Sequence, residues 1–74
     1  MVNTQLLDDK IAESGLKIGY IVEKIGLSRF GFDKKRKGIT PFRVSEIYVL
    51  CDLLGISDDE EKTKIFYPES KAID

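Results

Sequence analysis

The sequence predicts an all-α fold, a compact bundle of five short helices that forms a single domain over residues 1–74. Three observations support this fold class. Apolar residues recur at the spacings of three and four that place them on one side of a helix. Six glycines are spread along the chain, and several of them stand where a helix is expected to end. An apolar content of 42% is enough for one small globular unit and too high for a disordered tail.

The first two helices are expected over about residues 4–14 and 17–25. Asn3 or Thr4 can cap the first helix, because short polar side chains accept from the free backbone N–H groups of a helix start. Gly26 ends the second helix, since glycine tolerates the left-handed conformation of a helix end. The apolar stripes consist of Leu7 and Ile11 in the first helix and of Ile18, Ile21, Val22 and Ile25 in the second.

The third and fourth helices are separated by a short turn. We expect the third helix over residues 29–36, with Ser28 as its N-cap. The fourth helix is expected to begin with Thr40 as its cap and Pro41 in its first turn, or to begin later, at Val44. Its apolar pattern is the clearest in the chain. This apolar face consists of Val44, Ile47, Leu50, Cys51 and Leu54.

The fifth helix is announced by the sequence Ser-Asp-Asp-Glu at residues 57–60, which has the spacing of a capping box. Its acidic residues also suit the positive end of a helix dipole. We expect this helix to run to about Phe66 and to stop before Pro68.

The net charge of −1 hides a basic middle between acidic ends. Residues 17–43 carry eight Lys and Arg against two acids, a local charge of +6. Residues 1–16 carry −2 and residues 44–74 carry −5. Because binding depends on the local field rather than on the total charge, the middle of the chain is the expected site for a polyanion.

The composition favours a cytoplasmic protein. A single cysteine, Cys51, cannot form an internal disulfide, which fits a reducing compartment. The sequence has no run of about 18 apolar residues and no recognisable export signal at its start, so we expect neither membrane insertion nor export.

We expect no enzymatic activity and no cofactor or metal. The chain has no histidine, which is the usual general base near neutral pH and the commonest metal ligand. Cys51 lies on the apolar face of the fourth helix and is expected to be a small buried hydrophobe. The acidic pairs at residues 8–9, 58–59 and 60–61 are expected to be solvated helix starts rather than metal or acid–base sites.

The segment 16–38 has the pattern of a helix-turn-helix, in which two short helices are joined by a three-residue turn and the second lies in the DNA major groove. Val22 is expected to face the helix over residues 29–36, Leu27 to fill the turn and Phe32 to point inward. The residues expected to face away from the core are Ser28, Arg29, Phe30, Asp33, Lys34 and Lys37.

Two stretches of the chain resemble a known family. The first, "GLKIGYIVEKIGLSRFGFDKKRKG", resembles the helix-turn-helix of the lambda-repressor-like superfamily, which includes the Cro and XRE-type regulators. The second, "GITPFRVSEIYVLCDLLGISDDEEKTKIFYPES", is similar to the ending of small phage Cro-like proteins of Gram-positive bacteria. The resemblance covers roughly residues 4–67. It implies a DNA-binding domain of five helices in a bacterial cytoplasm, in which helix 28–37 reads the major groove.

This chain departs from the family at three positions. Ile18 stands where the family often has a glutamine that touches a phosphate. Gly31 lies inside the reading helix, where glycine costs about 1 kcal/mol relative to alanine. Arg36 occupies a position that is usually apolar, so it can bury only its stem. Two outcomes are open for Arg36: its charged group reaches a phosphate, or it loosens the end of the helix.

Four residues of the third helix are expected to face the bases. Arg29 is the first candidate, because arginine pairs bidentately with guanine, and Lys34 is the second. Phe30 either contacts a thymine methyl group or packs against the second helix. Asp33 either accepts from a cytosine amino group or, as we favour, pairs within the helix with Arg29 or Lys37.

Phosphate contacts and a dimer complete the expected interface. The residues assigned to phosphates are Lys35, Arg36, Lys37 and Arg43, with Ser28 and Thr40 as neutral donors. A lone helix-turn-helix presents a small interface, so we expect a homodimer that reads two half-sites about 34 Å apart. The residues expected at the dimer contact are Val49, Leu53, Phe66 and Tyr67.

The sequence therefore predicts a Cro-like transcription regulator from a prophage or mobile element that binds a double-stranded DNA operator sequence-specifically. The alternative is a protein-binding modulator or antirepressor on the same fold that acts on another regulator protein. The acidic C-terminal region motivates this alternative, because an acidic surface repels DNA and suits a basic partner.

Overall fold

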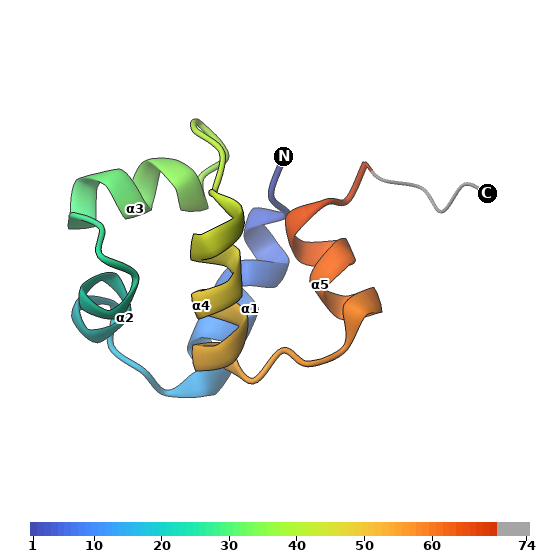
Figure 1. Ribbon diagram of the computed structural model, residues 1–74, viewed down its shortest axis with the longest axis horizontal. Coiled ribbons are helices and arrows are strands. Elements are labelled where there is room, and N and C mark those ends of the chain that lie inside the picture. Colours follow the sequence, from blue (N-terminus) through green and yellow to red (C-terminus); the bar gives the residue numbers. More distant parts are fainter. Residues whose placement is uncertain (70–74) are drawn as a thin grey trace.

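A computed structural model describes residues 1–69, which fold into five α-helices without a β-strand among them (Figure 1). The predicted all-α fold of five short helices is confirmed. The helices are α1 (Thr4–Ser14), α2 (Ile18–Ile25), α3 (Arg29–Arg36), α4 (Val44–Leu54) and α5 (Asp59–Phe66).

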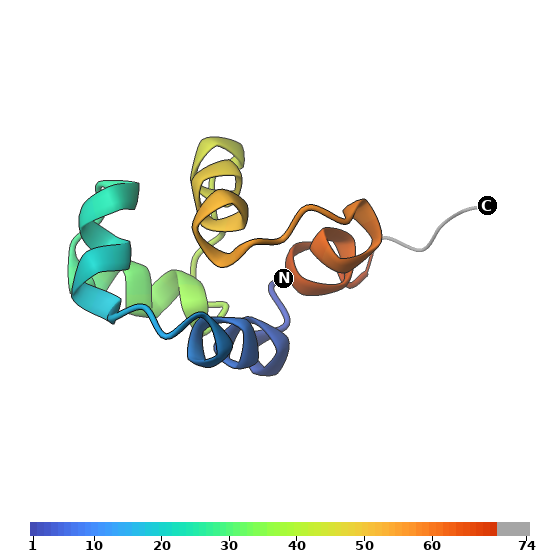
Figure 2. The ribbon, with the colours of Figure 1, turned by 90° about the horizontal axis from the view of Figure 1, so that it is seen from below.

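Helices α1 and α4 lie in the middle of the molecule (Figure 1). Helices α2 and α3 pack against each other at one end of the molecule, and α5 lies at the other end (Figures 1 and 2). Helix α4 contacts both α1 and α2, and α1 also contacts α5. This arrangement leaves α3 at the edge of the bundle, with one side available to solvent.

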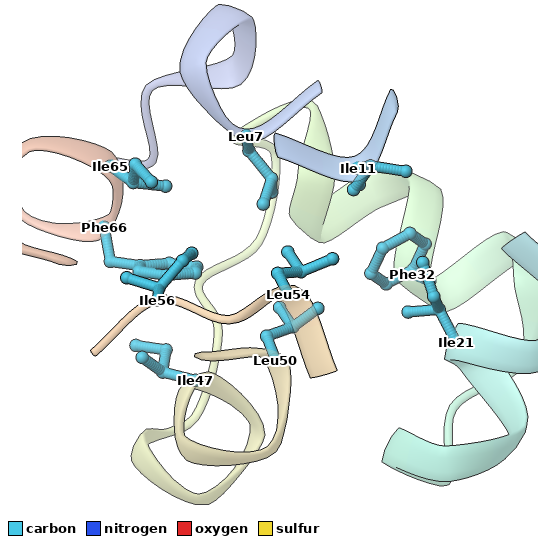
Figure 3. Packing of buried hydrophobic residues seen from close by; sticks show 10 residues of the cluster. All are labelled: Leu7, Ile11, Ile21, Phe32, Ile47, Leu50, Leu54, Ile56, Ile65 and Phe66. Carbon is cyan, nitrogen blue, oxygen red and sulfur yellow. The ribbon is translucent and has the colours of Figure 1, made fainter. Parts of the chain in front are cut away.

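The core draws side chains from every helix. Figure 3 shows these side chains converging between α1, α4 and α5, with Ile21 and Phe32 joining from α2 and α3. Phe42, in the loop before α4, makes edge-on contacts with the rings of Phe32 and Phe66 at centroid distances of 6.2 and 5.8 Å. The buried apolar residues are Leu7, Ile11, Ile21, Phe32, Ile47, Leu50, Leu54, Ile56, Ile65 and Phe66.

Three predicted helix starts are capped by side chains. The Asn3 carboxamide oxygen accepts from the Leu6 N–H at 3.1 Å. Ser28 Oγ accepts from the Gly31 N–H at 3.0 Å, which fixes the start of α3. In α5 the cap is Asp58, one residue after the predicted Ser57. These local hydrogen bonds satisfy backbone donors that the helices cannot satisfy themselves.

The start of α4 differs from the first of its two predicted positions. The helix begins at Val44, the later alternative, and Thr40 and Pro41 lie in the preceding loop rather than in a cap and first turn. The reason is the Glu46 carboxylate, which accepts from the Arg43 N–H at 2.8 Å and so supplies the cap from inside the helix. Val44 is 75% exposed and does not extend the apolar face of the helix, contrary to expectation.

The N-terminal segment is held against the end of α5. The Asn3 N–H donates to the Ile65 carbonyl at 2.6 Å.

None of the helices in the described part of the chain is long and apolar enough to span a membrane.

Candidate nucleic-acid interface

Helices α2 and α3 are joined by a tight turn over residues 26–28. Gly26 has φ +85°, a left-handed conformation that side-chain-bearing residues adopt only with strain. The N–H groups of Gly26 and Leu27 both donate to the Val22 carbonyl, at 2.9 and 3.0 Å. The end of α2 is thereby closed, and the chain reverses directly into α3.

One side of α3 is anchored in the core by Phe32. The Phe32 side chain is fully buried, as expected, and lies next to Ile21 of α2 (Figure 3). Val22 and Leu27 are half-buried and pack against the same core. The rotation of α3 about its own axis is therefore set by one large apolar residue. Phe30 and Lys34, two positions before and after Phe32, consequently lie on the other side of the helix.

The outward side of α3 presents an arginine, a phenylalanine and two lysines. Phe30 is 74% exposed, so the predicted alternative in which it packs against α2 is excluded. The Lys34 ammonium lies 5.3 Å from the centre of the Phe30 ring, one helical turn away. The Arg29 side chain is 62% exposed, and Lys37 is exposed at the end of the helix.

Asp33 lies between two arginines. Its Oδ2 is 3.5 Å from Arg29 Nε, and its Oδ1 accepts from an Arg36 terminal nitrogen at 2.9 Å. The favoured intrahelical pairing of Asp33 is present with Arg29, whereas the other expected partner, Lys37, is replaced by Arg36. Partial burial alone raises the pKa of the Asp33 carboxyl, but the Arg36 hydrogen bond and the Arg29 charge outweigh it and hold that pKa below 3.8.

In the free protein Arg36 is paired with carboxylates, and it does not loosen the end of α3. Its guanidinium donates to Asp8 of α1 at 3.2 Å as well as to Asp33, and it lies 5.9 Å from the centre of the Phe32 ring. The Arg36 carbonyl also accepts from the Thr4 hydroxyl at 3.0 Å. Arg36 thus ties the end of α3 to α1, and its charge is already paired.

Lys35 is paired as well, in a nearly buried contact with α4. Its ammonium donates to both oxygens of Glu46, at 2.6 and 2.8 Å, and 15% of the Lys35 and 9% of the Glu46 side chain remain exposed. Burial alone raises the pKa of Glu46, but the hydrogen bonds from Lys35 and from the Arg43 N–H hold it below 4.5. Lys35 was expected to contact a phosphate, and its pairing with Glu46 was not expected. The available signal was a glutamate at the third position of a helix that begins at Val44 without a side-chain N-cap.

The other residues assigned to phosphates surround the outward side of α3. The start of α4 lies beside the C-terminal end of α3 (Figure 1). Arg43 is exposed there, at the first turn of α4, and Thr40 is half-buried in the connecting loop. Ser28 is exposed at the start of α3, although its hydroxyl oxygen is engaged as the helix cap. Together with Lys37, these residues flank the outward side of α3 from both ends.

The residues expected at a dimer contact do not form one exposed set. Phe66 is 5% exposed and belongs to the core, which removes it from any interface on the folded protein. Leu53 is half-buried against the same core, and Val49 is half-buried too, whereas Tyr67 is 41% exposed. Sequence reasoning missed Tyr48 of α4, which is 77% exposed.

The side chains that could ligate a metal are dispersed over the described residues. No group of three or more Cys, Asp or Glu side chains among them lies close enough together to hold a metal ion. Cys51 is half-buried, and burial raises the pKa of its thiol, which makes the thiol a weaker nucleophile.

No protein-family model, curated protein or solved structure matches this chain.

Proposed function

We propose that this protein is a sequence-specific, double-stranded DNA-binding transcription regulator of the Cro-like kind, from a prophage or mobile element. In this proposal α2 and α3 act as a helix-turn-helix, and α3 enters the major groove. The observation that carries the proposal is the two-sided character of α3. Phe32 is fully buried, while Phe30 and half-exposed Lys34 lie on the opposite side of the helix and exposed Arg29 lies on its flank.

The chemistry of the outward side suits base edges. The major groove is about 12 Å wide and admits one α-helix, and its edges expose guanine acceptors and thymine methyl groups. Arg29 supplies a planar fork for guanine, and the exposed Phe30 ring supplies an apolar contact for a thymine methyl group. Lys34 extends the same row by one turn, within reach of a second base pair.

The backbone contacts are assigned to fewer cations than the sequence suggests. Lys37 and Arg43 are exposed, with Ser28 and Thr40 as neutral donors. The charges of Lys35 and Arg36 are paired with carboxylates, so we leave these two residues out of the phosphate set. With two phosphate-contacting cations per protomer, the slope of log K for DNA against log salt is expected to be about −1.8 per protomer. If all four cations contacted phosphates, the slope would be about −3.6.

We also propose a homodimer, because two copies reading two half-sites enlarge a small interface. Val49 and Tyr67 remain the candidates at its contact. Light scattering at micromolar concentration is the direct test, and a species of only 8.4 kDa both with and without operator DNA contradicts the dimer.

Selection from random double-stranded DNA tests the main proposal. Wild type is expected to enrich one sequence, and Arg29→Ala is expected to lose the preference at one base position, a change of about 1–3 kcal/mol. The matched control is Lys64→Ala, which removes an exposed cation from α5 at the far end of the molecule (Figure 1). Absence of DNA binding at low salt, or binding that is flat between low and moderate salt, refutes the proposal.

The second candidate function is a modulator that grips another regulator protein. It is favoured by the exposed acids Asp58, Asp59 and Glu60 at the start of α5, remote from the basic side of α3. Charge reversal at these three positions distinguishes the two functions. A modulator loses its basic protein partner, whereas a DNA-binding protein keeps its preferred sequence.

A further inference from the structure

We propose that Asp33 is a positioning residue for Arg29 and that a chain of ionic contacts from α1, in the order Asp8, Arg36, Asp33 and Arg29, sets the direction of the reading arginine before DNA is bound. This inference rests on the proposed function, because it concerns how Arg29 selects its base. It concerns contacts between side chains that are present in the free protein.

The contact to Arg29 leaves its recognition groups available. Asp33 Oδ2 faces Arg29 Nε at 3.5 Å. An end-on bidentate pair with guanine uses the two terminal nitrogens of arginine, on O6 and N7 of the base. A carboxylate on Nε therefore restrains the side chain without occupying the donors that read the base.

Exposure falls along the chain from Arg29 to Arg36, and Asp8 at its far end is 43% exposed. The Arg29 side chain is 62% exposed, Asp33 is 29% exposed and Arg36 is 22% exposed. Arg36 is held on its other side by Asp8, from a different helix, at 3.2 Å, and by the ring of Phe32. Asp33 is therefore fixed from behind, and the restraint on Arg29 originates in the contact between α3 and α1.

Simple electrostatics predicts a change in the affinity for all DNA, whereas the positioning role predicts a change in the preference for one base. Removing an acid from a DNA-binding surface raises the affinity for every sequence, because repulsion of the phosphates is relieved. A positioning acid also saves the ordering of a long side chain on binding. Its loss is therefore expected to reduce the preference for the base read by Arg29 by about two- to tenfold, whatever happens to the affinity for random DNA.

The experiment compares Asp33→Asn, Asp8→Asn and Asp9→Asn with wild type. Asp9→Asn is the matched control, because it removes the same charge from the neighbouring position of α1. The Asp9 carboxylate accepts from Gln5 and does not contact α3. Binding is measured against the selected operator and against the same operator with the guanine read by Arg29 replaced. Asp33→Asn and, more weakly, Asp8→Asn are expected to lower the ratio of the two affinities, and Asp9→Asn is expected to leave it unchanged.

A double-mutant cycle separates positioning from a general structural effect. In the Arg29→Ala background, Asp33→Asn is expected to leave the remaining base preferences unchanged, since the residue through which it acts is missing. The positioning role is overturned if Asp33→Asn lowers base preferences equally in wild type and in Arg29→Ala, or lowers them in neither protein. DNA binding by α3 stands in both cases.

A measurement without DNA keeps the inference testable if the proposed function fails. The Nε–H resonance of Arg29 in free wild-type protein is expected to exchange with water more slowly than that of an unrestrained arginine. Asp33→Asn is expected to abolish that protection, and Asp9→Asn to preserve it. An Arg29 resonance with no protection in wild type overturns the positioning chain, independently of any result on DNA.

Discussion

The nearly buried pair between Lys35 and Glu46 yields the sharpest prediction about stability. Removing one partner of a buried ion pair leaves an uncompensated charge, which costs about 3–5 kcal/mol in a fully buried setting. Lys35 keeps 15% of its side chain exposed, so water still reaches the ammonium. We therefore expect Glu46→Gln, which retains an oxygen for the Arg43 N–H, to lower the free energy of unfolding by about 2 kcal/mol.

The reverse substitution, Lys35→Met, is expected to cost about the same, because it strands the carboxylate. The double variant removes both charges and is expected to cost about 2 rather than 4 kcal/mol, a coupling energy of about 2 kcal/mol. Urea unfolding followed by circular dichroism measures all four proteins. A change of 2 kcal/mol is readily seen, because a domain of 74 residues is expected to be stable by about 4–11 kcal/mol.

The matched control is the exposed pair between Lys64 and Glu60 of α5. These side chains are 66% and 77% exposed and 3.9 Å apart, so their coupling is expected to be below about 0.5 kcal/mol. If the coupling between Lys35 and Glu46 is no larger than that of the control pair, the pair does not join α3 to α4 in the way described.

Three further predictions concern the core, a turn and acid. Phe32→Ala is expected to cost about 3–5 kcal/mol in urea unfolding, whereas Phe30→Ala, at a position 74% exposed, is expected to change stability by less than about 0.5 kcal/mol; equal losses contradict the assigned rotation of α3. Gly26→Ala is expected to cost about 1–2 kcal/mol through the strain of a positive φ alone, since a Cβ there has no neighbour within 4 Å; thermal unfolding shows this as a lower Tm. The lowered pKa of Glu46 means that its stabilising contribution is complete above pH 4.5 and is lost as the pH falls through the lower, folded-state value; unfolding from pH 6 to 3 is expected to show a smaller loss of stability in Glu46→Gln than in wild type, and equal losses contradict the pairing.

The ends of most helices were predictable because their signals are local. Asn3 and Ser28 cap helices through bonds to backbone groups three residues away, and a glycine in the left-handed region ends α2. The start of α3 at Arg29 follows from Ser28 and from the turn before it. Such signals depend on neighbouring residues alone, and a single sequence contains them in full.

The differences arise where distant residues meet. Helix α4 begins at Val44 because Glu46 closes its start while being held by Lys35, eleven positions away in the chain. Arg36 is paired with Asp8, which is 28 positions away. A run of cations in the sequence does not reveal which of its members will find a carboxylate in the folded protein. The exposure of Phe30 was nevertheless predictable, because it lies on the side of α3 opposite Phe32.

Phe66 and Tyr67 illustrate the same limit on a smaller scale. Both are aromatic and adjacent, and the sequence does not decide which of them is buried. The rotation of α5 decides it, and that rotation is supported by the Asn3 N–H on the Ile65 carbonyl, a contact across almost the whole chain. Phe66 consequently completes the core beside Phe42, and Tyr67 is left partly exposed.

Lys35 and Arg36 are paired with carboxylates of the same chain, which has a consequence for how a DNA-binding protein finds its site. A genome offers about 10⁶–10⁹ competing sequences, and the time spent on each depends on the affinity for DNA of any sequence. That affinity grows with each additional phosphate neutralised. If α3 contacts DNA as proposed, two cations withheld from the phosphates shorten each stay at a wrong sequence, while the base contacts of Arg29 and Lys34 are unaffected. On that proposal, the carboxylates that pair with these two cations favour a rapid search over long residence at one sequence.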